Sequence, residues 1–478
     1  MTSFAEEKAE QQRWTRILRR PNPAYDKLLE NEFETPEQYR IRNTQNLAAM
    51  LRFASREVPH YRAALRRVDV AAPDREPMNA LAALPVLAKL DVLDAGKSFL
   101  AENLPPGDSR VHWWESSGTT GRPMRVLHSM MSVRMHPLLA QRSSRWHRLD
   151  PAGKFAEMRI PRLLPRRTDG SEVPPGETIR LDRWRDFPDF ATGPYVGMNV
   201  LTPLQDRVAW LRQERPDYLM AYSETLEVVA MATSDEPPLD SLKAVLAISE
   251  QLTPSMRRYV ERRFGTPVHQ VYGLSEFGLV GLRCDAGRYH VNREHCLVEI
   301  VDEEGRACAP GETGRIIVTA LTNFAMPLLR YDTGDLAEAA VGPCPCNRTL
   351  PSFGEIVGRY SRVAHLPPGT MGPVLALREA IETMPVSIMR GLREFQIHQY
   401  ADKNMELRLL TQGELSEPFY ARIREVWAKA TGDDGRKLSF RGVSEIPKPP
   451  GGKSEVFTSD FMPTRDGKNP VAQGGMRA

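Results

Sequence analysis

The sequence feature that most constrains the fold is a strand–helix–strand pattern in the middle of the chain. Leu242–Ile248 and Val268–Tyr272 are short apolar runs of strand length. Between them, Thr253 and Pro254 supply a helix N-cap and first position, and Gly265 supplies a helix end. This order predicts a βαβ unit with parallel strands and a right-handed crossover, and therefore the α/β fold class.

The loops that follow these two predicted strands carry polar side chains. Ser249 and Glu250 follow the first strand, and Gly273-Leu274-Ser275-Glu276 follows the second. Ligands of parallel sheets collect beyond the carboxyl ends of the strands. We therefore expect Glu250, Tyr272, Ser275 and Glu276 along one edge of the sheet.

A segment near residue 120 is rich in glycine and hydroxyl side chains. It reads Ser116-Ser117-Gly118-Thr119-Thr120-Gly121-Arg122-Pro123 and joins two strand-like runs, Arg110–Glu115 and Met124–His128. Glycine lets the backbone approach a ligand closely and hydroxyls add donors, so the segment favours a polyphosphate site. It does not have the Walker A pattern. The alternative interpretation is a flexible surface loop.

The segments on either side of this region predict further elements. Residues 161–195 are rich in Pro, Gly, Arg and Asp and predict a long surface connection or lid. Cys296–Val301 and Gly314–Ala320 flank a turn-rich stretch, which predicts antiparallel strands.

The last part of the chain predicts a smaller α/β unit that begins near Ser361. Phe395–Tyr400 and Met405–Leu410 have strand-like composition, and a helix is expected near Pro418–Ala430.

Composition excludes some classes of partner and favours a soluble protein. The 64 basic and 61 acidic residues give a net charge of +3, which does not argue for nucleic acid or a membrane surface. No apolar run reaches the roughly 20 residues of a membrane span, and the N-terminus lacks a signal-peptide pattern. Five cysteines, an odd number, favour a reducing compartment, so we expect a cytoplasmic location.

Five motifs occur in a fixed order along the chain. They are SSGTTGRP from Ser116, YGLSEFG from Tyr272, RYDTGD from Arg330, Gly358-Arg359, and PKPPGGKSEVF around Lys453. In this order they resemble the signature motifs of the adenylate-forming superfamily, with the phenylacetate–CoA ligase branch as the nearest resemblance. VPHYR from Val58 and LPVLAK from Leu84 also resemble that branch, so the likeness covers nearly the whole chain.

The resemblance implies an architecture and a reaction. It implies a large N-terminal domain over residues 1–360, with parallel sheets and a small antiparallel region, and a mobile C-terminal α/β domain over residues 361–478. ATP and a carboxylic acid, expected to be aryl or arylacetic, would give an acyl-adenylate and pyrophosphate. Coenzyme A would then take the acyl group. This chemistry depends on positioning and charge neutralisation.

The resemblance also implies roles for individual residues. The residues that would bind the β- and γ-phosphates are Ser116, Ser117, Gly118, Thr119, Thr120 and Gly121. Tyr272 would contact adenine, and Ser275 would contact the α-phosphate. Glu276 would bind Mg²⁺, and Asp335 would bind the ribose, with Arg359 beside it. Ser249, Glu250 and Gly273 complete the expected nucleotide site. Each motif taken alone has a plainer interpretation as a turn or a cap.

Lys453 is the expected catalytic lysine. It follows Pro449-Pro450-Gly451-Gly452, which suits a mobile loop that carries a cation into a closed site. The alternative is a solvated surface lysine. A hinge is implied near Tyr360–Arg362. Arg122 replaces a lysine common in the family, and Ser361 stands where relatives often carry Asp or Lys, so the hinge residue stays open.

Four soft ligands suggest a structural zinc site. Five residues separate Cys284 from His290, and one residue separates Cys344 from Cys346. His295 and Cys296 compete as ligands, and Cys308 is expected to be unliganded. The alternative is buried free thiols beside a surface histidine.

The acid and the acyl acceptor stay open at this point. Tyr222, Ser223 and Gly278 are expected to line an apolar acid pocket. A carrier protein, an amine or another nucleophile could replace coenzyme A as acceptor, and a catalytically silent nucleotide-binding protein is a third interpretation. A homodimer is also compatible with the sequence.

Overall fold

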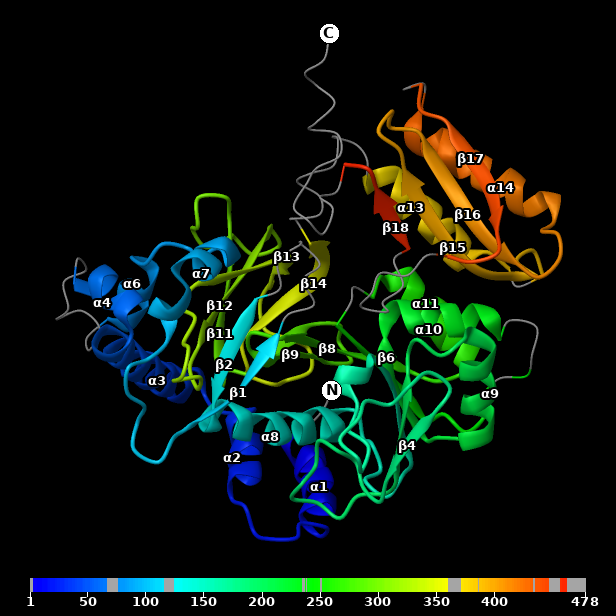
Figure 1. Ribbon diagram of the computed structural model, residues 1–478. Helices are drawn as coiled ribbons and strands as arrows, with labels where there is room; N and C mark the ends of the chain where they lie inside the picture. Colours follow the sequence, from blue (N-terminus) through cyan, green and yellow to red (C-terminus); the bar gives the residue numbers. More distant parts are fainter. Residues whose placement is uncertain are drawn as a thin grey trace.

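The computed structural model describes residues 3–66, 76–115, 124–233, 237, 239–249, 252–359, 371–385, 387–432, 435–446 and 456–461. Figure 1 shows a larger body around a long sheet, with a smaller C-terminal unit next to helices α10 (Ser223–Ala232) and α11 (Pro254–Phe264). This arrangement confirms the predicted α/β class, with a large body and a smaller unit. No helix in these ranges is long and apolar enough to cross a membrane.

Within the described residues, twelve strands form one continuous sheet, in the order β11-β12-β13-β14-β10-β9-β8-β7-β6-β3-β5-β4. The strands are β3 (Phe155–Arg159), β4 (Thr178–Leu181), β5 (Tyr195–Asn199), β6 (Tyr218–Tyr222), β7 (Ala244–Ile248), β8 (Val268–Leu274), β9 (Gly278–Arg283), β10 (Tyr289–Val291), β11 (Cys296–Val301), β12 (Thr313–Ala320), β13 (Tyr331–Ala339) and β14 (Ser352–Arg359). Strand β8 pairs in parallel with β7 and antiparallel with β9, so it joins a parallel half to an antiparallel half.

The parallel half contains the predicted βαβ unit. Strand β7, helix α11 and strand β8 follow one another, and the two strands are parallel. The Thr253 hydroxyl accepts a hydrogen bond from the Met256 amide at 3.1 Å, as an N-cap does. Gly265 ends the helix at φ +66°, a left-handed conformation that glycine adopts without steric cost. The local prediction is therefore confirmed.

The antiparallel half brings the later motifs into the sheet. Strands β11 and β12 pair antiparallel, as their sequence predicted. In the neighbouring pair, β13 and β14, Asp335 stands opposite Arg359. Two residues expected at the nucleotide are therefore cross-strand neighbours.

Helices and a hairpin surround this sheet. They are α1 (Phe4–Thr15), α2 (Ala24–Asn31), α3 (Pro36–Glu57), α4 (Pro59–Arg66), α6 (Pro77–Ala82), α7 (Lys89–Ala95), η1 (Gly96–Phe99), α8 (Met130–Trp146), η2 (Pro161–Leu163), α9 (Leu204–Glu214) and the strands β1 (Arg110–Glu115) and β2 (Arg125–Ser129). The pairing of β1 with β2 is antiparallel and confirms the two predicted strand-like runs.

The prediction for residues 161–195 is partly wrong. The segment contains the edge strand β4, and Trp184, Phe187 and Phe190 are buried with Trp14 in one aromatic cluster. Trp14 and Phe187 stack with ring centroids 5.3 Å apart. The segment is therefore part of a hydrophobic core, and not only a connection over the surface.

A buried ion network ties the N-terminal helices to α8. Glu32, at the end of α2, has no exposed surface and accepts from Arg142 Nε at 3.1 Å and Trp146 Nε1 at 2.8 Å. Arg145 and Arg348 also pair with Glu32. Glu7 and Glu294 supply the other carboxylates around these three guanidinium groups.

The C-terminal unit has its own four-stranded sheet among the described residues, in the order β17-β16-β15-β18. Its elements are α13 (Met371–Thr383), β15 (Leu392–Gln399), β16 (Met405–Thr411), α14 (Glu417–Thr431), β17 (Leu438–Val443) and β18 (Phe457–Ser459). Arg378 Nη2 lies 3.1 Å from Glu227 Oε2, which joins this unit to α10. The expected boundary between residues 360 and 361 lies outside the described residues and stays a prediction.

Candidate active site and metal cluster

The described structure contains only part of the expected site. The glycine-rich segment 116–123, Glu250, Lys453 and the expected hinge near Tyr360–Arg362 lie outside the described residues, as does the side chain of Arg359. The residues that remain still bring three motifs together.

Tyr272 and Asp335 meet directly, although 63 positions separate them in sequence. The Tyr272 hydroxyl donates to Asp335 Oδ2 at 2.8 Å, and both side chains are buried. Thr333 Oγ1 accepts from the Asp335 amide at 3.1 Å, which fixes the backbone beside the carboxylate. The residue expected at adenine therefore orients the residue expected at the ribose.

Glu276 lies beside the RYDTGD strand. The Tyr331 hydroxyl donates to Glu276 Oε1 at 3.3 Å. The same hydroxyl is 4.0 Å from the sulfur of Met124, the first described residue after the glycine-rich segment. Tyr331, which is buried at the start of β13, therefore contacts both the flank of that segment and the YGLSEFG motif.

His128 contacts a residue of the expected site and was not among the residues predicted from the sequence. Its Nε2 lies 3.2 Å from the Ser275 carbonyl oxygen and its Nδ1 lies 3.1 Å from Ser132 Oγ. Burial lowers the pKa of His128 to about 4, so the ring is neutral near pH 7. Nε2 then donates to Ser275 and Nδ1 accepts from Ser132. A histidine inside an apolar strand was the only signal that the sequence offered.

Ser249 has a backbone conformation that its sequence does not reveal. It follows β7 with φ +63°, a left-handed conformation that is uncommon for residues other than glycine. Such conformations persist where the surrounding structure holds them, and they concentrate at functional sites. The strand end expected at the nucleotide therefore carries a strained residue.

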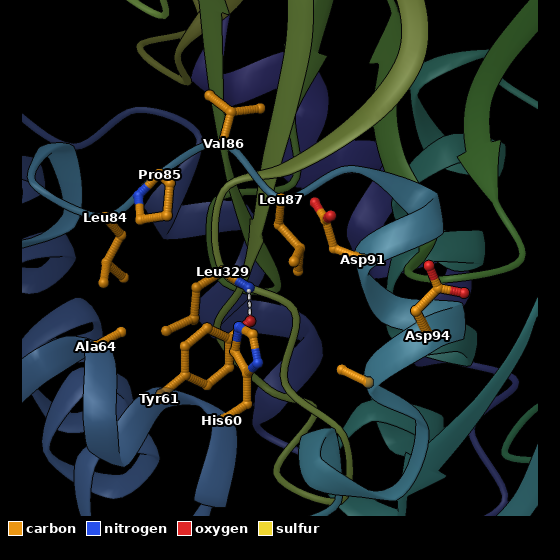
Figure 2. A pocket seen from close by; sticks show the side chains of 11 residues that line it. His60, Tyr61, Ala64, Leu84, Pro85, Val86, Leu87, Asp91, Asp94 and Leu329 are labelled. Atoms are coloured by element: carbon orange, nitrogen blue, oxygen red, sulfur yellow. Dashed lines mark hydrogen bonds between the residues drawn. The ribbon is translucent and has the colours of Figure 1, made fainter.

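The VPHYR and LPVLAK motifs support β13 from outside the site. The Leu87 amide donates to the Arg330 carbonyl at 2.9 Å, and the Asp332 amide donates to the Leu87 carbonyl at 2.9 Å. A cavity of about 510 Å³ lies between the two motifs. Figure 2 shows the side chains that line it, with the Tyr61 ring beside Leu329. These contacts fix the start of the strand that carries Asp335.

Replacing Tyr61 with phenylalanine is expected to destabilise the protein by about 1–3 kcal/mol, because a buried donor loses its acceptor. The Tyr61 hydroxyl accepts from the Leu329 amide at 2.9 Å, and both residues are buried. Urea denaturation measures the change. Tyr420→Phe, at a half-buried ring on α14, is the matched control. Equal effects of the two substitutions would contradict the expectation.

The three residues expected at the acid lie in two places that the structure describes. Tyr222 is buried with Ile160, Val200 and Ile248, and Ser223 has no exposed surface. Gly278 instead borders a separate cavity of about 10 Å³ beside Trp114. That volume holds one water at most, so an acid would require side chains around Gly278 to move apart.

Cys284, His290, Cys344 and Cys346 form one buried cluster. Their ligand atoms all lie within 4.8 Å of one another. Cys284 Sγ is 3.7 Å from Cys344 Sγ, and Cys346 Sγ is 3.2 Å from His290 Nε2. His290 Nδ1 lies 3.1 Å from the Leu350 carbonyl, which leaves Nε2 for the cluster.

The competing ligands lie elsewhere. His295 Nδ1 is 2.6 Å from Thr322 Oγ1, and the Cys296 thiol contacts the Val280 carbonyl at 3.8 Å. Cys308 is half-exposed and outside the cluster. The structure therefore groups the four residues that the sequence singled out.

Comparisons with known proteins bear on the family and the fold of this chain. The family described as AMP-binding enzyme matches residues 194–325, which hold β5 to β12. A phenylacetate–coenzyme A ligase of Thermus thermophilus is 26% identical over 413 residues, or 82% of this chain and 85% of that protein. One of Escherichia coli K12 is 25% identical over 352 residues, or 69% and 72% of the two chains.

Two solved structures share the fold. A 2-hydroxyisobutyryl-CoA ligase in complex with 2-HIB-AMP aligns with a TM-score of 0.67 at 15% identity, covering 90% of this chain and 91% of that one. An acyl acid amido synthetase in complex with 2,4-DB aligns with a TM-score of 0.53 at 14% identity, covering 89% and 90%.

The fold is that of the adenylate-forming enzymes, and the AMP-binding enzyme family matches the central part of the chain. Sequence similarity along most of the chain then confirms the expected resemblance to the phenylacetate–CoA ligase branch of that superfamily.

Proposed function

We propose that this protein is an AMP-forming acid–thiol ligase. A carboxylic acid attacks the α-phosphate of ATP, which releases pyrophosphate and leaves an acyl-adenylate. The thiol of coenzyme A then attacks the acyl carbon and releases AMP. The main support is the contact of Tyr272 with Asp335 beside Glu276, in a chain similar to phenylacetate–CoA ligases over most of its length.

The described residues suit the first half-reaction. Asp335 would accept the ribose hydroxyls while Tyr272 holds it in place, and Ser249, Glu250, Gly273 and Arg359 would complete the nucleotide site. His128 holds the Ser275 backbone, so that the Ser275 hydroxyl can meet the α-phosphate. Lys453 would contact the carboxylate and the α-phosphate. Such groups act by placing charge where it develops in the transition state.

Magnesium would bind at Glu276, a half-buried carboxylate oriented by Tyr331. An oxygen donor with phosphate neighbours is the usual environment of this ion, and when bound it would offset phosphate charge. Ser116–Gly121 would hold the β- and γ-phosphates.

The proposed acid is aryl or arylacetic, because the curated relatives are named phenylacetate–coenzyme A ligases. Gly278, with Tyr222 and Ser223 at the end of β6, remains the proposed pocket. Trp114 and Phe277 beside Gly278 offer the flat apolar walls that an aromatic ring requires.

Carboxylate-dependent exchange of pyrophosphate into ATP tests the proposal. A panel of aryl, arylacetic and aliphatic acids is supplied first, and coenzyme A is then added to the positive reactions. Exchange with an aryl acid, followed by thioester and AMP, is the expected result. Nucleotide binding without exchange on any acid would contradict the proposal and favour a silent binder.

The acyl acceptor has an alternative, which is an amine or a carrier-protein thiol in place of coenzyme A. The fold is shared with an acyl acid amido synthetase, so fold alone does not select a thiol. Exchange that continues without consumption of coenzyme A would favour an amine or a carrier-protein thiol. We also propose a cytoplasmic location, and light scattering would distinguish a monomer from a homodimer.

We propose a structural zinc ion at the cysteine cluster. A tetrahedral ion with Zn–S bonds of about 2.3 Å requires neighbouring sulfurs about 3.8 Å apart. Cys284 and Cys344 have their sulfurs 3.7 Å apart, so the donor set and the spacing suit zinc. Four protein ligands leave no open position, and the ion would tie β9 and β10 to the segment before β14.

Removing this zinc is expected to lower Tm and to release about one ion per chain. Cys344→Ser should lose the ion, and Cys308→Ser, outside the cluster, should keep it. Elemental analysis and thermal unfolding measure the two effects. An unchanged zinc content and Tm in Cys344→Ser would refute the site.

A further inference from the structure

The small cavity beside Gly278 has a polar lining that the proposed function does not use. Its volume of about 10 Å³ is close to the space that one water-sized group occupies. Besides its aromatic walls, three polar side chains line it, which are those of Ser132, His136 and His295. A single hydroxyl or amino group has the same size as that water.

His136 has a buried ring nitrogen without a partner. Its Nδ1 has almost no exposed surface and no hydrogen-bond partner among the described residues. Its Nε2, in contrast, lies 3.7 Å from Asp186 Oδ1. A carboxylate beside an imidazole favours the tautomer with the proton on the nitrogen that faces it. Nδ1 then keeps a lone pair, and a buried acceptor without a donor costs stability.

Asp186 is held in place as a carboxylate. Burial raises its pKa, but Arg185, whose Nε donates to Oδ1 at 3.1 Å, lowers it, and the net shift is below the usual range. The neighbouring Trp184 and Phe187 are buried in the aromatic cluster with Trp14. This packing fixes the segment that presents the carboxylate to His136.

Ser132 supplies a second acceptor at the cavity. It lies one helical turn before His136 on α8, so the two side chains share a face of the helix. The Ser132 hydroxyl donates its proton to His128 Nδ1 at 3.1 Å, because the neutral His128 ring uses its own proton at the Ser275 carbonyl. The oxygen of Ser132 keeps its lone pairs. Both ring nitrogens of His295 already have partners, so the polar groups left at the cavity are acceptors.

We propose that the acid activated by this protein carries a hydroxyl or amino group on its aromatic ring, and that His136 and Ser132 accept hydrogen bonds from it. This inference rests on the proposed function and specifies the substrate class of its acid pocket. The ring would lie between Trp114 and Phe277, with the side chains around Gly278 moved apart to admit it. An unsubstituted ring would leave the two acceptors buried and unpaired, and a methyl group of similar size would bring no donor.

Pyrophosphate exchange with matched acids tests the inference. Benzoate and phenylacetate are each compared with their hydroxyl, amino and methyl derivatives at every ring position. The best hydroxyl or amino acid is expected to exceed both its parent and its methyl analogue by roughly 10-fold or more in kcat/KM. The ratio for two acids in one preparation does not depend on the fraction of the protein that is folded.

Variants of His136 assign this preference to the histidine. His136→Phe keeps a flat ring and removes both nitrogens, so the preference should disappear. His136→Asn, whose amide oxygen is an acceptor, should keep part of it. His60→Phe is the matched control, because His60 is a half-buried histidine that stacks on Phe99 outside the site. This control should retain the native preference.

The outcomes separate this inference from the proposed function. Equal exchange with substituted and unsubstituted acids in the native chain would overturn the inference and leave the ligase proposal standing. A native preference that survives in His136→Phe would do the same. Exchange with no acid at all would refute the ligase proposal, and this inference with it.

Discussion

Replacing Lys453 with alanine is expected to reduce acid-dependent pyrophosphate exchange by roughly 10²–10³-fold, the usual effect of removing a charge that contacts the reacting atoms. Binding of ATP should persist, because the nucleoside is proposed to bind at Tyr272 and Asp335, which hydrogen-bond to each other, and not at the lysine. The reverse exchange assay measures the first effect and equilibrium dialysis the second.

Lys437→Ala is the matched control for this prediction. Lys437 is an exposed lysine in the same C-terminal unit, just before β17, and no expected role touches it. If Lys453→Ala retained native exchange, the proposed adenylation chemistry would be wrong at its centre. Synthesis of thioester from a supplied acyl-adenylate should fall much less, because the lysine is assigned to the first half-reaction.

Replacing Glu32 with glutamine is expected to destabilise the protein by about 3–5 kcal/mol, the range for breaking a buried ion pair. Arg142, Arg145 and Arg348 would keep only Glu7 and Glu294 as carboxylate partners. Three buried guanidinium charges would then face two carboxylates. Urea denaturation followed by tryptophan fluorescence measures the effect, because Trp146 contacts Glu32 directly.

Glu30→Gln on the same helix is the control for Glu32→Gln. Glu30 is exposed and pairs with Lys27 at 2.8 Å, so its substitution should cost about 1 kcal/mol or less. Equal costs for the two substitutions would show that the buried network does not depend on charge balance.

The sequence predicted those elements whose signals are local. The unit from β7 through α11 to β8 carries its own cap, first-turn proline and terminal glycine, and the structure agrees. The order of the motifs also predicts that Tyr272 and Asp335 share one site, and a hydrogen bond joins them in the structure. Signals of this kind can be found in the sequence because they do not depend on how distant segments pack.

The features that the sequence did not predict have a common physical cause, because the burial of a side chain depends on partners that are distant in sequence. Arg142 and Arg348 would be expected at the surface, yet carboxylates from α1 and α2 allow their burial. Trp184 lies in a segment of turn-forming composition, and its packing against Trp14 and Phe155, distant in sequence, makes it part of the core. His128 acquires its role from Ser275, 147 positions away.

Strand β8 has a consequence for how the protein opens. The first three residues of β8, Val268–Gln270, pair with β7, and its last four, Val271–Leu274, pair with β9, so a single strand carries both ladders. Amide hydrogen exchange is therefore expected to report one shared opening free energy for β7, β8 and β9, and not two independent ones. In that case the two halves of the sheet open as a single cooperative unit, with the expected nucleotide edge at its seam.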